Sequence, residues 1–257
     1  MLLIDKYAYF NRLKHIHPVE KVTLALSLLF FSLAVKNNHV SIATFFIMSG
    51  LIIFGARISI SYYAKLLLLP SFFLCSGIVT ILISFASIDT AIHNELWSFS
   101  IGEWKLFISQ DNSTKAIQLL FVTFSSISCL YFLILTTSVH DLMQVLQKLK
   151  LPKLLIEMME ITYRFIFVFL DTALQIYQAQ NARLGYRTGK RWLYSISLLA
   201  SSLLMAVFKR SKELTNALES RAYADDFAYI DNRYQLSAVN WLIILAVLAA
   251  LFFISIL

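Results

Sequence analysis

The chain has 257 residues, 59% of them hydrophobic, and a formal net charge of +7. A soluble domain is usually about 45–50% apolar, so this composition excludes an ordinary soluble fold and indicates the lipid bilayer as solvent. An excess of Lys and Arg in cytoplasmic loops explains the charge better than nucleic-acid binding, because no basic run accompanies a soluble fold. Cys75 and Cys129 lie in apolar runs and are expected to be buried thiols without a disulfide.

Apolar segments along the chain predict the membrane helices, because a helix that crosses the hydrocarbon core needs about 20 mostly apolar residues. Five segments approximately meet this requirement, near residues 22–35, 39–56, 66–88, 116–137 and 238–257. The third contains Pro70, expected close to its start, where the missing N–H costs least. The sequence therefore predicts an all-α, polytopic membrane protein with about five spanning helices.

The distribution of Lys and Arg between loops predicts the orientation. Residues 1–21 and 138–237 are rich in these cations, whereas the loop near 89–115 is mostly acidic. We therefore expect a cytoplasmic N-terminus in the cell (inner) membrane and an external C-terminus. The expected division is an N-terminal membrane domain of four spans (1–137), long amphipathic cytoplasmic helices (138–237) and a last spanning helix (238–257).

The stretch from residue 192 to 208 is apolar enough to suggest a sixth span. The cationic pairs Lys190–Arg191 and Lys209–Arg210 flank it, and a crossing would place one pair outside and reverse the last helix. Burial against other helices, or a position at the membrane interface, is favoured. Insertion of this stretch into the membrane stays open.

Residues 154–183 have the period of an amphipathic helix, with polar and apolar side chains on opposite stripes. The polar stripe consists of Glu157, Glu160, Arg164, Asp171, Gln175 and Gln178. Pro152 marks the start of this helix and Gly185 its end. A second helix is expected near 205–223, so two long amphipathic helices are predicted beneath the membrane.

Sequence motifs for nucleotide binding or catalysis are missing. The pair Gly189–Lys190 precedes Arg191 and lacks the upstream Gly of a phosphate-binding loop, so the chain does not bind ATP by that route. His15 and His17 have no further ligand nearby, and a surface or interfacial role is favoured over a metal site. We expect no catalytic residue, metal or cofactor. The scarcity of ionisable residues in the spans favours a partner that binds the substrate.

Three features together resemble the transmembrane T component of energy-coupling-factor ABC transporters, especially the CbiQ type of cobalt uptake systems. Two are the stretches Asn11–Lys21 and Leu151–Glu157, the latter followed by Thr162–Phe165. The third is a pair of short Arg motifs, Ala182-Arg183-Leu184 and Ser220-Arg221-Ala222, similar to two Ala-Arg-Gly-like triplets of that family. Leu184 and Ala222 replace the family's Gly, which allows a tight backbone approach.

The resemblance implies a coupling role without enzymatic activity. The two Arg motifs would dock two ATP-binding-cassette ATPase subunits, and the apolar helix faces would pack against a substrate-binding membrane subunit, the S component. Independently, an Arg at an exposed helix end suits a carboxylate on a partner. ATP hydrolysis would thereby drive uptake of a transition-metal ion, cobalt first and nickel next.

Other interpretations remain open. A stand-alone solute transporter would need polar residues in its spans and inverted repeats. A membrane-embedded enzyme would need clustered His, Asp or Glu, and Asp225, Asp226 and Asp231 are expected to form a solvated turn instead. A further alternative is that Arg183 and Arg221 bind no partner protein and face only anionic lipid or solvent.

Overall fold

The computed structural model describes residues 3–35, 37–82, 84–87, 95–101, 104–221, 234 and 236–256. Side chains are described for these residues except 3–6, 84–109 and 111. The chain forms two compact units. Residues 2–142 and 233–257 make up the first, here the bundle unit, and residues 143–232 make up the second, here the hairpin unit.

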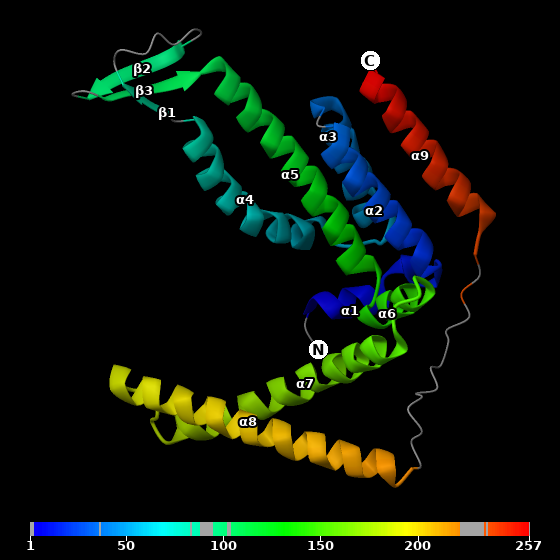
Figure 1. The fold of residues 1–257 in the computed structure, drawn as a ribbon, viewed down its shortest axis with the longest axis vertical. Helices are drawn as coiled ribbons and strands as arrows, with labels where there is room; N and C mark the ends of the chain where they lie inside the picture. Colours follow the sequence, from blue (N-terminus) through cyan, green and yellow to red (C-terminus); the bar gives the residue numbers. More distant parts are fainter. Residues whose placement is uncertain are drawn as a thin grey trace. The chain divides into compact units, whose positions relative to one another are not determined.

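Five helices of the described part of the bundle unit are long and apolar enough to cross a membrane. They are α2 (Pro18–Val35), α3 (Asn38–Gly50) with its π-helical extension η2 (Leu51–Gly55), α4 (Ile60–Leu82), α5 (Gln110–Thr136) and α9 (Ala238–Ile256). Helices α2, α3, α5 and α9 lie side by side, and α4 packs against α5 (Figure 1). The predicted polytopic helical fold is confirmed.

Shorter helices flank the first and fourth of these spans and were not predicted. Before α2 lie α1 (Leu3–Phe10) and the 3-10 helix η1 (Arg12–His15), and after α5 lies α6 (Val139–Lys148). Pro18 occupies the first position of α2, where its missing N–H is not needed. Helix α3 has Asn37 as its N-cap, whose Oδ1 accepts a hydrogen bond from the His39 N–H at 3.1 Å.

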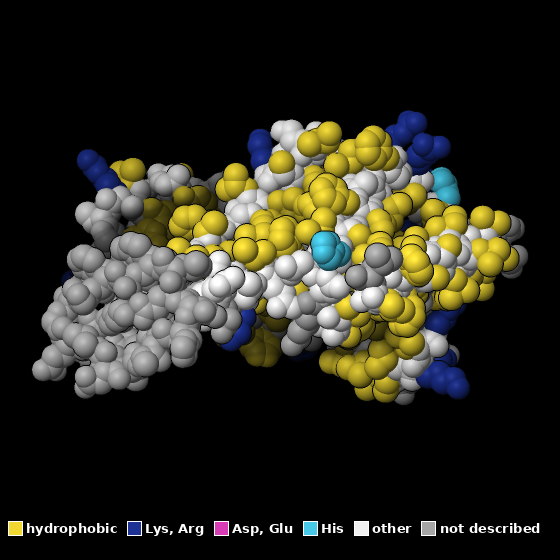
Figure 2. Space-filling view, turned by 90° about the horizontal axis from the view of Figure 1, so that it is seen from above, with side chains coloured by type: hydrophobic (Ala, Val, Ile, Leu, Met, Phe, Trp, Pro, Cys, Tyr) yellow, Lys and Arg dark blue, Asp and Glu magenta, His cyan; other side chains and the backbone are white. Residues whose placement is uncertain are grey.

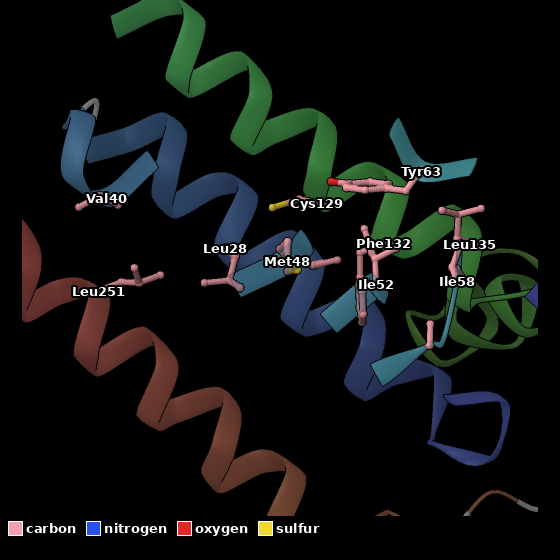
Figure 3. Packing of buried hydrophobic residues seen from close by; sticks show 12 residues of the cluster. Leu28, Val40, Met48, Ile52, Ile58, Tyr63, Cys129, Phe132, Leu135 and Leu251 are labelled. Carbon is pink, nitrogen blue, oxygen red and sulfur yellow. The ribbon is translucent and has the colours of Figure 1, made fainter. Parts of the chain in front are cut away.

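The bundle core is a cluster of apolar side chains contributed by α2, α3, η2, α4, α5, α9 and the turn between η2 and α4. Leu28, Met48, Cys129 and Leu251 are fully buried in it (Figure 3). Burial was expected for both cysteines, and this expectation is wrong for Cys75, which is exposed on α4. The apolar surroundings of a helix facing lipid and of one facing the core look alike in sequence, which explains the error.

Hydroxyl groups also join the bundle helices. Ser32 Oγ of α2 lies 3.1 Å from Ser125 Oγ of α5. Tyr63 of α4 donates from its hydroxyl to Ser128 Oγ of α5 at 3.1 Å. Small side chains let helices approach closely in lipid, where the hydrophobic effect does not drive one helix against another. These contacts therefore fix helix positions that apolar packing leaves less specific.

Helix α4 differs in position from the span predicted near 66–88, because it begins at Ile60 and ends at Leu82. The expectation that Pro70 lies close to the helix start is therefore wrong, and Pro70 lies in the helix interior. Its missing N–H deprives the Leu66 carbonyl of its helical donor. The Tyr131 hydroxyl of α5 donates to this carbonyl at 2.9 Å, so a neighbouring helix satisfies it.

A small antiparallel sheet occupies the end of the span predicted near 66–88 and part of the segment predicted as an acidic loop near 89–115. Its strands are β1 (Ser84–Ser87), β2 (Glu95–Ile101) and β3 (Trp104–Ser109), in the order β1-β3-β2. A bulge interrupts β2 between Glu95 and Trp97. The alternation of apolar and polar residues from Trp97 to Ile101 is the period-2 signal that would have indicated a strand.

The hairpin unit consists mainly of α7 (Lys153–Ala182) and α8 (Gly189–Glu219), which pack against each other. The helix predicted over 154–183 is confirmed. The apolar stretch 192–208 and the helix predicted near 205–223 are one continuous helix, α8. By length and hydropathy alone α8 also qualifies as a membrane span, the sixth within the described residues.

Figure 2 shows apolar side chains over much of the described surface on the face that it draws. Phe54, Phe72 and Phe73 on η2 and α4 are each at least 80% exposed. Such side chains are ordinary on a surface that faces lipid and unfavourable on one that faces water. The surface therefore supports a protein that is embedded in a membrane.

Candidate functional site

The first Arg motif forms the C-terminal cap of α7. Arg183 is the C-cap residue, and Leu184 has a φ of 58°, in the left-handed region. The Leu184 N–H donates to the Asn181 carbonyl at 2.9 Å, and the Gly185 N–H donates to the Gln180 carbonyl at 3.0 Å. These two bonds define a Schellman motif, which ends a helix at a residue of positive φ.

This cap gives a physical reason for the Gly that the resemblance implies at the position of Leu184. Glycine enters the left-handed region without a Cβ clash, whereas another residue is destabilised by about 1 kcal/mol there. The requirement at residue 184 is thus a backbone conformation, and Leu184 adopts it with strain.

The turn after Leu184 is fixed to both helices. Ser195 of α8 donates from Oγ to the Gly185 carbonyl at 2.9 Å. A Cβ at residue 185 would lie 2.6 Å from Ser195 Oγ and 3.0 Å from the Gln180 carbonyl oxygen, so this turn requires Gly. The Tyr186 hydroxyl donates to Gln180 Oε1, and its ring lies against Tyr177. Sequence reasoning missed Ser195 and Gln180, because their role depends on contacts through the turn.

The second Arg motif ends α8. Ser220 is the C-cap residue, and both its N–H and its hydroxyl donate to the Asn216 carbonyl. The Arg221 N–H donates to the Leu218 carbonyl at 3.1 Å. Ala222, the third residue of this motif, lies outside the described residues. Its replacement of Gly therefore stays a sequence observation.

The two motifs are exposed and far apart. The side chains of Ala182, Arg183, Leu184, Ser220 and Arg221 are all exposed. Helix α8 separates the motifs, and its 31 residues span about 45 Å. The structure therefore places the predicted residues at two separate helix ends and does not bring them into one pocket.

Each motif presents a cation at the C-terminal end of a helix, where the helix dipole favours positive charge. Within the described part of the chain, neither the Arg183 nor the Arg221 guanidinium has a hydrogen-bond or ion-pair partner. Each guanidinium offers five donors in a planar fork that matches a carboxylate. The arrangement can bind an acidic group at each of two points.

The histidines considered as metal ligands lie in different surroundings. His15 is exposed, whereas His17 is buried and its Nδ1 accepts a hydrogen bond from the Val19 N–H at 3.1 Å. The surface role expected for His17 is therefore wrong, and the interfacial role given as its alternative stays a prediction. Among the described residues, no group of three or more His, Cys, Asp or Glu side chains is arranged to hold a metal ion.

Comparison with known proteins identifies the family. The sequence profile of CbiQ, described as a cobalt transport protein family, matches residues 10–229. The chain belongs to the CbiQ family. The matched region includes both Arg motifs, α7 and α8, and the resemblance expected from the sequence is confirmed. The chain is thus a multi-pass membrane protein of a transport family.

Three relatives show how this CbiQ-family chain compares with longer and similar proteins. A Methanocorpusculum labreanum protein, whose name describes a fused cobalt transport protein CbiMQ, is 32% identical over 212 residues, 80% of this chain. These residues are 35% of that protein, so the chain spans about a third of it. The cobalt transport proteins CbiQ of Salmonella typhimurium and Rhodobacter capsulatus are each 27% identical. The alignments cover 87% and 96% of this chain, and 98% and 95% of those proteins.

Proposed function

We propose that this chain is the transmembrane coupling subunit of an energy-coupling-factor transporter. It links ATP hydrolysis by two ATPase subunits to uptake of a transition-metal ion, cobalt first and nickel next. A separate membrane subunit binds the ion, and the N-terminus and the hairpin unit are cytoplasmic. The observation that supports this function most strongly is the exposure of Arg183 and Arg221 at the ends of two long helices of the family-matched region.

The spacing of the Arg motifs suits two partners. Helix α8 keeps Arg183 and Arg221 apart by about 45 Å, and about 30 Å is the diameter of a small domain. Each motif therefore has room for one ATPase subunit, which supplies a carboxylate for the guanidinium. Two identical subunits related by symmetry would provide two equivalent acceptors, one for each helix end.

The apolar surface of the hairpin unit suits a membrane neighbour. Met158 and Leu174 of α7 are 57% and 56% exposed, and Leu193 and Phe208 of α8 are 64% and 68% exposed. Met158 belongs to the predicted apolar stripe of α7 and is exposed, whereas Glu157 of the polar stripe is buried. Exposed apolar patches of this kind mark interaction sites for protein or lipid. We assign them to the substrate-binding membrane subunit and to lipid.

The mechanism follows from the two kinds of contact. Closure of the ATPases on ATP moves the two docked helix ends relative to each other. The helices α7 and α8 pass this displacement to the membrane subunit packed against their apolar sides. The ATPases drive the change only if their contacts differ between the open and closed states. In this mechanism the chain transmits a displacement between its partners and has no catalytic residue.

Charge reversal at both motifs tests this function. The variant carrying Arg183→Glu and Arg221→Glu is expected to lose both ATPase subunits, because each docking carboxylate then faces another carboxylate. The measurement is co-purification of the ATPases with the tagged chain from detergent. A matched control carries Arg187→Glu and Arg191→Glu, which change exposed residues near α7's end but outside the motifs. Recovery of an intact complex from the first variant would contradict the proposed function.

A further inference from the structure

Five polar or charged side chains are buried together in the bundle unit around the start of α2. They are Asn11, His17, Glu20, Lys21 and Asp141, none more than 7% exposed. A buried ion is unfavourable by several kcal/mol unless its hydrogen bonds are satisfied. The hydrogen-bond partners of these five side chains therefore show which segments of the chain the cluster fixes in place.

Lys21 holds the C-terminal end of α5. Its Nζ donates to the carbonyl of Thr136, the last residue of α5, at 2.8 Å and to the Leu13 carbonyl at 3.3 Å. The Asn11 amide also donates to the Leu135 and Thr136 carbonyls, at 3.2 and 3.4 Å. A cation at a helix C-terminus is favoured by the helix dipole. The N-terminal segment thus fixes the point at which α5 ends.

The contacts continue into the start of α6. Ser138 Oγ accepts a hydrogen bond from the Asp141 N–H at 3.1 Å, which caps the helix. The Asp141 carboxylate acts electrostatically on the Lys21 ammonium. Its Oδ1 also accepts a hydrogen bond from the Tyr234 hydroxyl at 2.9 Å. Asp141 therefore links the end of α5 to the chain that precedes α9.

Glu20 holds the start of α9. Its Oε1 accepts a hydrogen bond from the Ser237 N–H at 2.8 Å, and its Oε2 accepts one from the Asn240 side-chain amide at 2.6 Å. Ser237 directly precedes α9, so Glu20 supplies an N-cap carboxylate from another helix. A negative charge at a helix N-terminus is favoured by the dipole.

These contacts coincide with the two places where the chain passes between its units. The chain leaves the bundle unit after Leu142 and returns to it at residue 233. Lys21 and Asp141 fix the outgoing connection, and Glu20 and Asp141 fix the returning one. We propose that Glu20, Lys21 and Asp141 form a clamp that holds both chain connections of the hairpin unit and transmits its displacement to α5 and α9.

The clamp rests on the proposed coupling function and adds positioning residues to it. A displacement of the hairpin unit is transmitted to the bundle helices only if neither of the two chain connections bends on its own. Apolar packing of similar volume would stabilise the fold as well as a buried ion network does, but with less geometric specificity. The directional bonds of Glu20 and Lys21 supply that specificity at both connections.

The test compares metal-ion uptake with ATP hydrolysis in the reconstituted complex. The variants Lys21→Met and Glu20→Gln keep side-chain length and remove the charge. In proteoliposomes with both ATPases and the substrate-binding subunit, we expect ATP hydrolysis to stay within about twofold of wild type, while ⁵⁷Co²⁺ uptake falls about tenfold, within the usual range of coupling energies. Lys14→Met, at an exposed position of the same segment, is the control and keeps normal uptake.

Hydrogen exchange gives a readout that does not depend on transport. Lys21→Met is expected to speed exchange of the amides at 137–142 and Glu20→Gln those at 237–241, each about tenfold, because these amides lie at the released connections. The core of α3, at 44–48, should keep its wild-type protection in both variants. Unchanged exchange at both connections would overturn the clamp.

Failure of the clamp and failure of the proposed function give different results. A wild-type complex that takes up no ⁵⁷Co²⁺ refutes the proposed function, and hydrogen exchange still decides whether the clamp exists. Normal uptake by both variants, or an equal loss of uptake and ATP hydrolysis, overturns the clamp alone. Where a variant does not assemble, Tyr234→Phe removes the hydrogen bond to Asp141 and Asn240→Ala removes the one to Glu20, and the same outcomes are expected in weaker form.

Discussion

At the scale of single residues, three helix ends in the described part of the chain adopt a left-handed conformation without glycine. Arg57, Lys150 and Leu184 have φ values of 55°, 60° and 58° and follow η2, α6 and α7. The chain has only 6 glycines, so most helix ends must terminate without one. Arg57 and Lys150 place a cation near the negative end of a helix dipole, which offsets part of the strain. Leu184 has no such compensation.

Leu184→Gly is therefore expected to stabilise the protein. Glycine relieves the left-handed strain, worth about 1 kcal/mol, while the exposed Leu184 side chain contributes little packing. The measurement is the melting temperature of the purified chain in detergent. Leu174→Gly is the matched control, because residue 174 is equally exposed but lies within α7, where glycine destabilises by about 1 kcal/mol. A lower melting temperature for Leu184→Gly would show that the cap is not strained.

The sequence predicted that the Arg motifs lie at helix ends, but it did not predict the conformation there. Gly185 was expected to end α7, and it occupies the second residue of the cap. The left-handed residue is Leu184, which has a low intrinsic preference for that conformation. Side-chain hydrogen bonds from Ser195 of α8 and from Tyr186 within the turn fix this conformation, and neither bond leaves a recognisable sequence pattern.

At the scale of helices, α4 shows how one element depends on another. Pro70 removes the donor for the Leu66 carbonyl, and Tyr131 of α5 supplies a replacement. In lipid an unsatisfied carbonyl has no water to bind, so a neighbouring side chain must satisfy it. The position of α5 is thereby tied to the interior of α4 as well as to the apolar core.

A double-mutant cycle tests this dependence. Tyr131→Phe is expected to destabilise the wild-type chain by about 1–2 kcal/mol, because the Leu66 carbonyl is left unsatisfied. In a Pro70→Ala background the backbone N–H restored at position 70 would supply the donor, so the same change should cost about 0.5 kcal/mol or less. Thermal unfolding of the four proteins in detergent measures the coupling. Equal losses in both backgrounds would refute the role of Tyr131.

The membrane helices could be predicted from the sequence where the length of an apolar segment sets their bounds. Helices α2, α3, α5 and α9 lie close to the predicted spans, whereas α4 begins earlier because Tyr62, Tyr63 and Lys65 are accommodated in its first turns. Strand β1 was missed because its residues were assigned to the end of a span, and β2 and β3 were missed because an acidic segment between two spans was interpreted by charge alone. The buried cluster around Glu20 and Lys21 was missed because its partners lie more than 100 residues away.

At the scale of the whole molecule, the path of α8 decides between two topologies. Its 31 residues span about 45 Å, more than the hydrocarbon core of about 30 Å, and cationic pairs flank its apolar stretch. A crossing α8 gives six spans, both termini on one side and the two Arg motifs on opposite sides. A non-crossing α8 gives five spans and keeps both motifs on one side, as ATPase docking requires.

Cysteine labelling distinguishes these topologies. In a background with Cys75→Ser and Cys129→Ala, we introduce Asn181→Cys and Glu219→Cys, exposed positions next to the motifs but outside them. A membrane-impermeant maleimide applied to intact cells is expected to label neither position, and the same reagent applied to inverted vesicles is expected to label both. Lys115→Cys, in the first turns of α5, should be labelled in intact cells and serves as the control. Labelling of only one of the first two positions in intact cells would mean that α8 crosses the membrane, and ATPases on one side then have no access to both arginines.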